Sequence, residues 1–352
     1  MNSNVARRQD PWHFVVQNLL QLLETSPDLS SHLMIALKNS KRFEEPLLES
    51  YCYLVHRMQT TIPNPTDWLP MNLEFYYVLA CSENNYLAKH NEFMEWVRLY
   101  VESIGTWMDS PDSVKEIETF YNHKLFTIND YVAPPGGWKT YNQFFSRQIK
   151  SGARQIDEIY NDRIISSAAD SSFCGHQKIS AESTVIAKGI SWSISELLAG
   201  SAYADSFANG WYGHSFLAPH NYHRFHTPVK GSLIELRRIM GKVTMDVHLC
   251  ADNTLSVSRA EIGYQFQQER GLAIIDSPLG LVAVIPIGMG IVSSVNFSAV
   301  NNAWLEKGAE LGFFSFGGSD VVLLFQKQAS LDWLVEEGDV IRQGQSIAIS
   351  RY

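Results

Sequence analysis

The chain has 352 residues, of which 45% are hydrophobic and 18% are charged, and its net charge is −9. This length and apolar content predict a protein with one large domain or two and exclude a disordered chain. The negative charge disfavours nonspecific binding to nucleic acid.

Residues 11 to about 125 show the pattern of amphipathic helices. Apolar residues recur at three- and four-residue intervals in the stretch WHFVVQNLLQLL, residues 12–23. Few basic residues flank it, so we expect it to pack on a neighbouring helix and not on a membrane. Similar patterns follow in EEPLLESYCYLVHRMQ and HNEFMEWVRLYVESIGTWM. We therefore predict a helical N-terminal domain over residues 1–135.

The pattern changes at the Pro-Pro-Gly-Gly cluster within residues 131–145, which is typical of a boundary. Beyond it the chain has short β-rich segments separated by glycine turns: STVIAKGISWSI, GSLIELRRIMGKVTMDVHL, GLVAVIPI and SDVVLLF. The last segment, WLVEEGDVIRQGQSIAIS, resembles the turn pattern of barrel-sandwich hybrid folds. We predict an α+β protein whose residues 136–352 form a β-rich, barrel-sandwich-hybrid-like catalytic domain.

Two further features bear on location. The most apolar stretch, residues 280–292, is too short to span a bilayer and is interrupted by Pro286, Gly288 and Gly290. It predicts a buried strand, so we expect no integral membrane segment. The four cysteines are widely spaced and form no CxxC pair, which is typical of thiols in a reducing compartment. These features favour a cytoplasmic protein.

The stretch APHNYHRFHTP, residues 218–228, places His220, His223 and His226 at three-residue intervals. The prolines at both ends exclude a long helix here. Three histidines could ligate zinc, but no HExxH motif accompanies them and acidic residues nearby are sparse. Packing is an adequate explanation for His220 alone, but a poor one for all three. The remaining interpretation is acid–base catalysis, for which imidazole is suited near neutral pH.

Two other stretches carry candidate chemistry. In RIISSAADSSFCG, residues 163–175, Asp170 is a turn or capping residue unless the fold brings a histidine close to it. In FSFGGSDVVLLF, residues 315–326, Gly317 and Gly318 leave the backbone bare beside Ser319, which could then act as a nucleophile. The order Gly-Gly-Ser-Asp departs from the GxSxG elbow of α/β-hydrolases.

Taken in chain order, several stretches resemble the phosphatidylserine decarboxylase family of pyruvoyl enzymes over roughly residues 140–326. They are YNQFFSRQIKSGARQID, IISSAAD, AKGISWSISELL, HNYHRFHTPVKG, GLVAVIPIGMGIVSSV and KGAELGFFSFGGSDVVLLF. Several motifs in order are more specific than any one of them. The helical N-terminal part resembles the extra domain of soluble members that decarboxylate free amino acids, such as the fungal tryptophan decarboxylase.

The resemblance implies that the chain cuts its own Gly318–Ser319 bond. The serine hydroxyl attacks the preceding carbonyl, an ester forms, and β-elimination releases the upstream β-subunit. Residues 319–352 then form the α-subunit, which begins with a pyruvoyl group derived from Ser319. Gly317 and Gly318 would allow the strained turn that the attack needs. The pyruvoyl group would serve as the cofactor, with neither PLP nor a metal.

The family's Ser–His–Asp arrangement maps onto Ser319, His226 and Asp170, with His226 as the base and Asp170 orienting it. His223 matches the family's other histidine, and we expect it to protonate the carbanion left by decarboxylation. Asp320 departs from the family, which usually has serine or threonine there. A carboxylate at this position would disfavour the negative charge that develops during β-elimination.

The apparent absence of an anchor and the helical N-terminal part favour a free L-amino acid as substrate, with aromatic ones among the candidates. Phosphatidylserine is the alternative. A metal-dependent hydrolase built on the three histidines, and a relative that binds an amine or a lipid without processing, are further alternatives. Family members commonly form dimers, so a homodimer is a candidate assembly.

Overall fold

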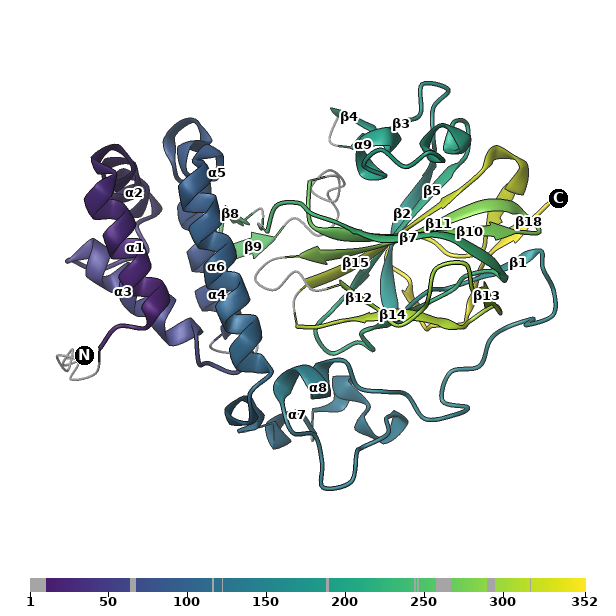
Figure 1. Cartoon of the computed structure of the whole chain (residues 1–352), viewed down its shortest axis with the longest axis horizontal. Coiled ribbons are helices and arrows are strands. Elements are labelled where there is room, and N and C mark those ends of the chain that lie inside the picture. Colours follow the sequence, from purple (N-terminus) through teal and green to yellow (C-terminus); the bar gives the residue numbers. More distant parts are fainter. Residues whose placement is uncertain are drawn as a thin grey trace. The chain divides into compact units, whose positions relative to one another are not determined.

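The computed structural model describes residues 11–63, 68–115, 117–121, 123–187, 190–243, 245, 247–257, 267–289, 295–316 and 318–352. The chain divides into two compact units. One comprises Met1–Trp107 with Asp246–Val257, and the other comprises Met108–Met245 with Ser258–Tyr352. Figure 1 shows the first mostly in purple and blue, and the second in teal to yellow.

The first unit is helical, because its apolar residues recur on one face of each helix. In the first helix Val15, Val16, Leu19 and Leu23 are buried, as the spacing predicts. The indole of Trp96 donates a hydrogen bond of 2.9 Å to the carbonyl of Val15 and so joins the first and last helices. The helices are α1 (Phe14–Thr25), α2 (Pro27–Ser40), α3 (Leu47–Met58), α4 (Trp68–Ala80), α5 (Tyr86–Lys89) and α6 (Asn91–Met108).

A β-hairpin from the later sequence belongs to this helical unit. Its strands, β8 (Val247–Leu249) and β9 (Leu255–Val257), pair antiparallel and pack against α4. Arg42 donates a hydrogen bond of 2.8 Å to the carbonyl of Asn253 at the tip of the hairpin. The first unit is therefore built from two separate parts of the chain.

The second unit is built on an antiparallel sheet of eight strands. In spatial order these are β13 (Trp304–Leu305), β7 (Gly231–Ile239), β10 (Arg270–Ser277), β11 (Gly280–Met289), β15 (Gly318–Phe325), β5 (Trp211–Leu217), β2 (Ser171–Lys178) and β17 (Val340–Ile341). The apolar run from Val282 to Ile287 forms the buried strand that the sequence predicts.

Three smaller sheets complete the unit. One contains β1 (Ile164–Ser166), β18 (Ser346–Ser350) and β16 (Leu331–Trp333), a second contains β12 (Val295–Phe297), β14 (Glu310–Phe314) and β6 (Arg224–His226), and a third pairs β3 (Thr184–Ala187) with β4 (Ile190–Ser193). The described helices are short: α7 (Glu118–Tyr121), α8 (Tyr141–Phe145) and α9 (Ile194–Leu197).

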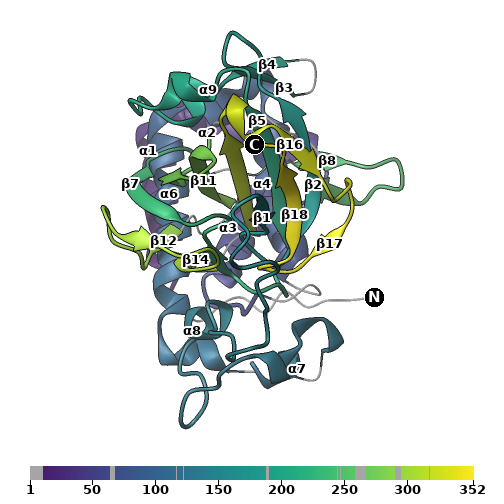
Figure 2. The ribbon, with the colours of Figure 1, turned by 90° about the vertical axis from the view of Figure 1, so that its right-hand side faces the viewer.

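The two faces of the large sheet are covered by different elements. One face carries an apolar core to which Val322 and Leu324 of β15 contribute, together with residues of β3 and α9. On the other face, methyl groups added at Gly213 and Gly271 would meet the rings of Trp333 and Phe297 at 2.5 Å. The two three-stranded sheets therefore cover this second face. In Figures 1 and 2, β3, β4 and α9 lie at the top of the unit, whereas β12 and β14 lie below.

This architecture confirms the predicted α+β class. The expected turn forms at Gly136 and Gly137, both with φ of 74°, and the N–H of Gly137 donates to the carbonyl of Pro134. It lies inside the second unit, and the domain limit at 135/136 stays a prediction. No helix within the described part of the chain combines the length and apolar character that crossing a membrane requires.

Candidate functional site

Ser319 lies at the start of β15, between two neighbouring strands. It pairs with Gly288 of β11 and with Leu217 of β5, and it is fully buried. Since strand side chains alternate and Val322 faces the apolar core, Ser319 faces the side covered by the three-stranded sheets. Among the described residues its hydroxyl has no hydrogen-bond partner. Gly318 begins the strand, whereas Gly317, expected as the flexible turn, lies outside the described residues.

His223 is fully buried next to the segment that leads to Ser319. Its carbonyl accepts the N–H of Phe314, and its ring lies 3.8 Å from the ring of Phe145. Burial lowers the pKa of His223 well below its usual value, and the charge of Arg147 lowers it further. The ring is therefore neutral.

The tautomer of the His223 ring follows from the hydrogen bond of its Nδ1 atom. Nδ1 lies 3.0 Å from the carbonyl oxygen of Asn221, which can only accept, so Nδ1 carries the hydrogen. Nε2 then holds a lone pair and has no partner among the residues that the structure describes. A buried, unprotonated imidazole nitrogen of this kind can accept a proton and return it.

His226 lies three residues further on and is also buried, but both of its ring nitrogens are engaged. Nδ1 donates to the carbonyl of Gly308 at 2.9 Å, and Nε2 accepts from the hydroxyl of Tyr222 at 3.1 Å. Burial lowers the pKa of His226, although the hydrogen bond to Gly308 opposes this effect. His226 is therefore also neutral, with its lone pair directed to Tyr222.

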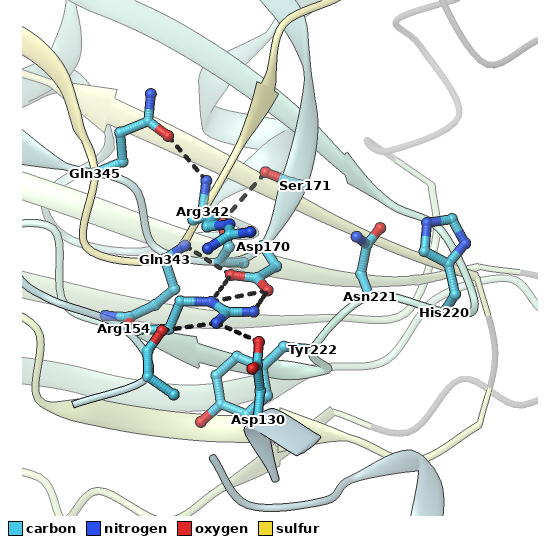
Figure 3. Close-up of polar contacts among 12 residues, drawn as sticks. Asp130, Arg154, Asp170, Ser171, His220, Asn221, Tyr222, Arg342, Gln343 and Gln345 are labelled. Atoms are coloured by element: carbon cyan, nitrogen blue, oxygen red, sulfur yellow. Dashed lines mark hydrogen bonds and ion pairs between the residues drawn. The ribbon is translucent and has the colours of Figure 1, made fainter. Parts of the chain in front are cut away.

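Asp170 lies close to His226 along the backbone, because the N–H of His226 donates to the carbonyl of Ala168 at 2.8 Å. Its carboxylate, however, binds Arg154, whose Nε lies 2.9 and 3.1 Å from the two carboxylate oxygens. It also accepts the N–H of Gln343 at 2.8 Å. Figure 3 shows the Arg154 guanidinium between Asp170 and Asp130. Within the described residues, hydrogen bonds link neither Asp170 to His226 nor His226 to Ser319.

His220 lies apart from this network (Figure 3). It is half-buried, and burial lowers its pKa, as do electrostatic interactions with His123 and Arg147. Across the described ranges, His, Cys, Asp and Glu side chains nowhere gather in threes where a metal ion could be held. The geometry of the described residues therefore gives no support to the metal-dependent hydrolase.

The opposite face of β15 holds a feature that the sequence did not reveal. Asp320 points away from Ser319, and its Oδ1 lies 3.3 Å from Nε2 of His214 on β5. Both side chains are fully buried. Burial alone would lower the pKa of His214, but the carboxylate of Asp320 outweighs it and raises the pKa to about 10. The charge of Asp320 is therefore balanced by an imidazolium on the face of β15 opposite Ser319.

Arg154 and His214 were both missed as site residues. Arg154 occurs in the stretch YNQFFSRQIKSGARQID, but nothing in its spacing indicates a carboxylate partner 16 residues later. His214 occupies a β-strand whose alternation predicts only that its side chain shares a face with Tyr212. The one signal in the sequence was the position of Asp320 directly before the apolar run of residues 321–325. An acid buried with such a strand needs a cation nearby.

Comparisons with known proteins identify the family of the segment that carries these residues. The family model for phosphatidylserine decarboxylase matches residues 141–349, more than half of the chain. The chain is 36% identical to phosphatidylserine decarboxylase proenzyme 2 of Oryza sativa subsp. japonica, over 65% of this chain and 36% of that protein. It is 30% identical to the phosphatidylserine decarboxylase proenzyme of Fusobacterium nucleatum, over 69% of this chain and 77% of that protein. It is 34% identical to phosphatidylserine decarboxylase proenzyme 3 of Schizosaccharomyces pombe, over 63% of this chain and 22% of that protein.

The chain thus spans about a third of the length of the rice relative and most of the bacterial one. The family model leaves residues before 141 outside its match. The likeness of the helical part to decarboxylases of free amino acids therefore stays a prediction.

Proposed function

Because the chain belongs to the phosphatidylserine decarboxylase family, we propose that it is a self-processing, pyruvoyl-dependent decarboxylase that acts on phosphatidylserine. The observation that carries the proposal is Ser319: a fully buried hydroxyl without a partner in the described structure, directly after Gly318. A buried hydroxyl without a hydrogen bond lowers the stability of the fold, so its presence needs an explanation. A role in the chemistry of the site supplies one.

Self-cleavage would proceed in two steps. First, Oγ of Ser319 attacks the carbonyl carbon of Gly318; the C–N bond breaks, and the hydroxyl proton passes to the released amine. The chain is then joined by an ester. Second, the Cα proton of Ser319 is removed and its Cβ–Oγ bond breaks, so that Gly318 leaves as a carboxylate. Water finally replaces the nitrogen of residue 319, and ammonia leaves.

The described residues can assist these proton movements in different ways. His226 would take the hydroxyl proton of Ser319 once the hydroxyl of Tyr222 turns away from Nε2. Asp170, held by Arg154, would favour the charged form of His226 through its nearby negative charge. Nε2 of His223, whose lone pair has no partner in the described part of the chain, is suited to carry a proton to and from the substrate carbon.

The residues fit the expected prosthetic group, since Ser319, which would become it, is fully buried and its hydroxyl has no hydrogen bond within the described structure. The pyruvoyl group would supply a ketone that draws electrons from the substrate carbon as carbon dioxide leaves. The chain's own part would be to hold the neutral imidazole of His223 in a dry setting, where proton transfer is not shared with water.

The comparisons favour phosphatidylserine over the free amino acid expected first. The relatives named above all carry phosphatidylserine decarboxylase in their names. The preference for an amino acid rested on the apparent lack of an anchor and on the helical N-terminal part, neither of which specifies a headgroup.

The test begins with purified full-length chain. Denaturing gels should show that the 39.8 kDa chain splits into a large and a small piece. Mass spectrometry should then find a small piece of residues 319–352 whose mass is one ammonia lower than the serine-ended peptide. Ser319→Ala should abolish the split, whereas Ser315→Ala, a matched serine in the same segment, should not.

The substrate is tested by release of labelled carbon dioxide from phosphatidylserine vesicles, free L-serine and L-tryptophan. We expect turnover on vesicles. Turnover on the free amino acids alone would overturn the lipid assignment, and an intact chain with no ketone-ended piece would overturn self-processing.

A further inference from the structure

We propose that Asn142 is a positioning residue for the self-cleavage and that Asp109 holds it in place. This inference rests on the proposed processing at Gly318–Ser319. Asn142 lies in α8, outside the histidine and aspartate stretches considered above, and its side chain reaches the segment directly before the scissile bond.

The contact is a hydrogen bond to the backbone. Oδ1 of Asn142 accepts the N–H of Phe316 at 2.9 Å, and both residues are buried. The ring of Phe316 packs against two aromatic rings of α8, with centroid distances of 5.4 Å to Tyr141 and 5.0 Å to Phe145. The chain two residues before Gly318 is thus fixed by both its backbone and its side chain.

The orientation of the Asn142 amide is determined by its two partners. Its Nδ2 donates to Oδ1 of Asp109 at 2.9 Å, and a carboxylate can only accept there. The N–H of Phe316 can only donate, so the amide oxygen must face it. Helix α8 is itself anchored, because the N–H of Tyr141 donates to the hydroxyl of Ser113 at 2.8 Å. A chain of contacts therefore runs from Asp109 through Asn142 to Phe316.

These contacts matter because they fix the chain before the Gly318–Ser319 bond, whereas strand pairing fixes the chain after it. Ser319 is fixed by pairing with β11 and β5, and on the other side of the bond Asn142 holds the N–H of Phe316. An attack of a hydroxyl on the preceding carbonyl depends on the angle between them, and small displacements of reacting groups are costly in rate. Holding Phe316 keeps the carbonyl of Gly318 within reach of Oγ.

The experiment measures precursor cleavage over time after synthesis of the full chain. Asn142→Ala removes the anchor, and Asn142→Asp places a carboxylate against Asp109. We expect both to slow cleavage by about 100-fold. The double variant Asn142→Asp/Asp109→Asn restores both hydrogen bonds with the donor and acceptor exchanged between positions 142 and 109, and it should cleave nearly as fast as the wild type.

Two further measurements separate positioning from folding. In the uncleavable Ser319→Ala background, Asn142→Ala should lower the unfolding midpoint only modestly, by no more than the loss of one buried hydrogen bond explains. Among chains that have been cut, turnover per pyruvoyl group should equal that of the wild type, since the bond that Asn142 positions is already broken.

The outcomes are distinguishable. Cleavage of Asn142→Ala at the wild-type rate, or a double variant as slow as Asn142→Asp alone, would overturn the inference while leaving the proposed function intact. A large loss of stability in the Ser319→Ala background would also overturn it, in favour of a purely structural role. If the wild-type chain itself is not cut at this bond, the proposed function fails instead.

Discussion

The buried pair of His214 and Asp320 allows a quantitative test of the electrostatics beside the proposed cleavage site. Replacing His214 with glutamine removes the imidazolium that lies 3.3 Å from the buried carboxylate of Asp320. The rise in the pKa of His214 from its usual 6.5 to about 10 corresponds to about 5 kcal/mol in favour of the charged ring. Removing one member of a buried pair generally costs about 3–5 kcal/mol. We therefore expect His214→Gln to lower the free energy of unfolding by several kcal/mol.

The assay is chemical denaturation of chains that carry Ser319→Ala, so that cleavage does not change the protein under study. His214→Gln/Asp320→Asn removes both charges and should recover most of the lost stability, because a neutral buried pair needs no counter-ion. As a control, Asp332→Asn breaks the exposed pair with Arg351 and should leave the unfolding midpoint nearly unchanged.

The stabilising contribution of His214 should depend on pH in a defined direction. His214 has a folded-state pKa above its unfolded value, so its stabilising contribution is fully present below about pH 6.5 and is lost as the pH rises through about 10. The difference between the wild-type residue and His214→Gln should therefore shrink across this window. Equal midpoints for the two chains at pH 6, or a difference that does not change up to pH 10, would refute the reasoning.

Three other substitutions test the packing around the site by denaturation and limited proteolysis. Arg154→Ala should cost about 3–5 kcal/mol, since its side chain is 5% exposed and that of Asp170 is 8% exposed; an unchanged midpoint would contradict a buried pair. Lys307→Met removes a buried ammonium that donates to three backbone carbonyls of residues 158–164. It should cost about 3 kcal/mol and make that segment sensitive to protease, and resistance equal to the wild type would count against this anchoring. Gly213→Ala would bring a methyl group to 2.5 Å from the ring of Trp333 and should cost about 1–3 kcal/mol, whereas a neutral effect would mean that the second face is loosely covered.

Periodicity and composition were enough to predict much of the fold. The helical spacing around Val15 and the apolar run of β11 each follow from a local pattern, because burial of one face or of both faces leaves a regular trace in the sequence. The insertion of the β8–β9 hairpin into the helical unit could not be predicted this way. Its partner, α4, lies far earlier in the chain, and no local signal records such a contact.

Several residues of the candidate site could be predicted from the sequence, but their hydrogen bonds and ion pairs could not. Three-residue spacing and flanking prolines identified His223 and His226 as unusual, yet they gave no hint that one would keep a free lone pair and the other would bind Tyr222. Similarly, Asp170 was chosen for an orienting role, whereas its carboxylate binds Arg154. Such partners are set by tertiary contacts between distant segments.

Strand alternation explains how β15 can carry both Ser319, the proposed nucleophile, and an adjacent acid. From the sequence, the carboxylate of Asp320 was expected to disfavour the negative charge that develops as the ester breaks. In a strand, however, neighbouring side chains lie on opposite faces, so Ser319 faces the small sheets while Asp320 lies on the side of the apolar core. There it is paired with His214, and the net charge of the pair is close to zero. An aspartate in place of serine or threonine is then compatible with cleavage as long as His214 stays charged, which ties the departure at one position to a histidine on the neighbouring strand.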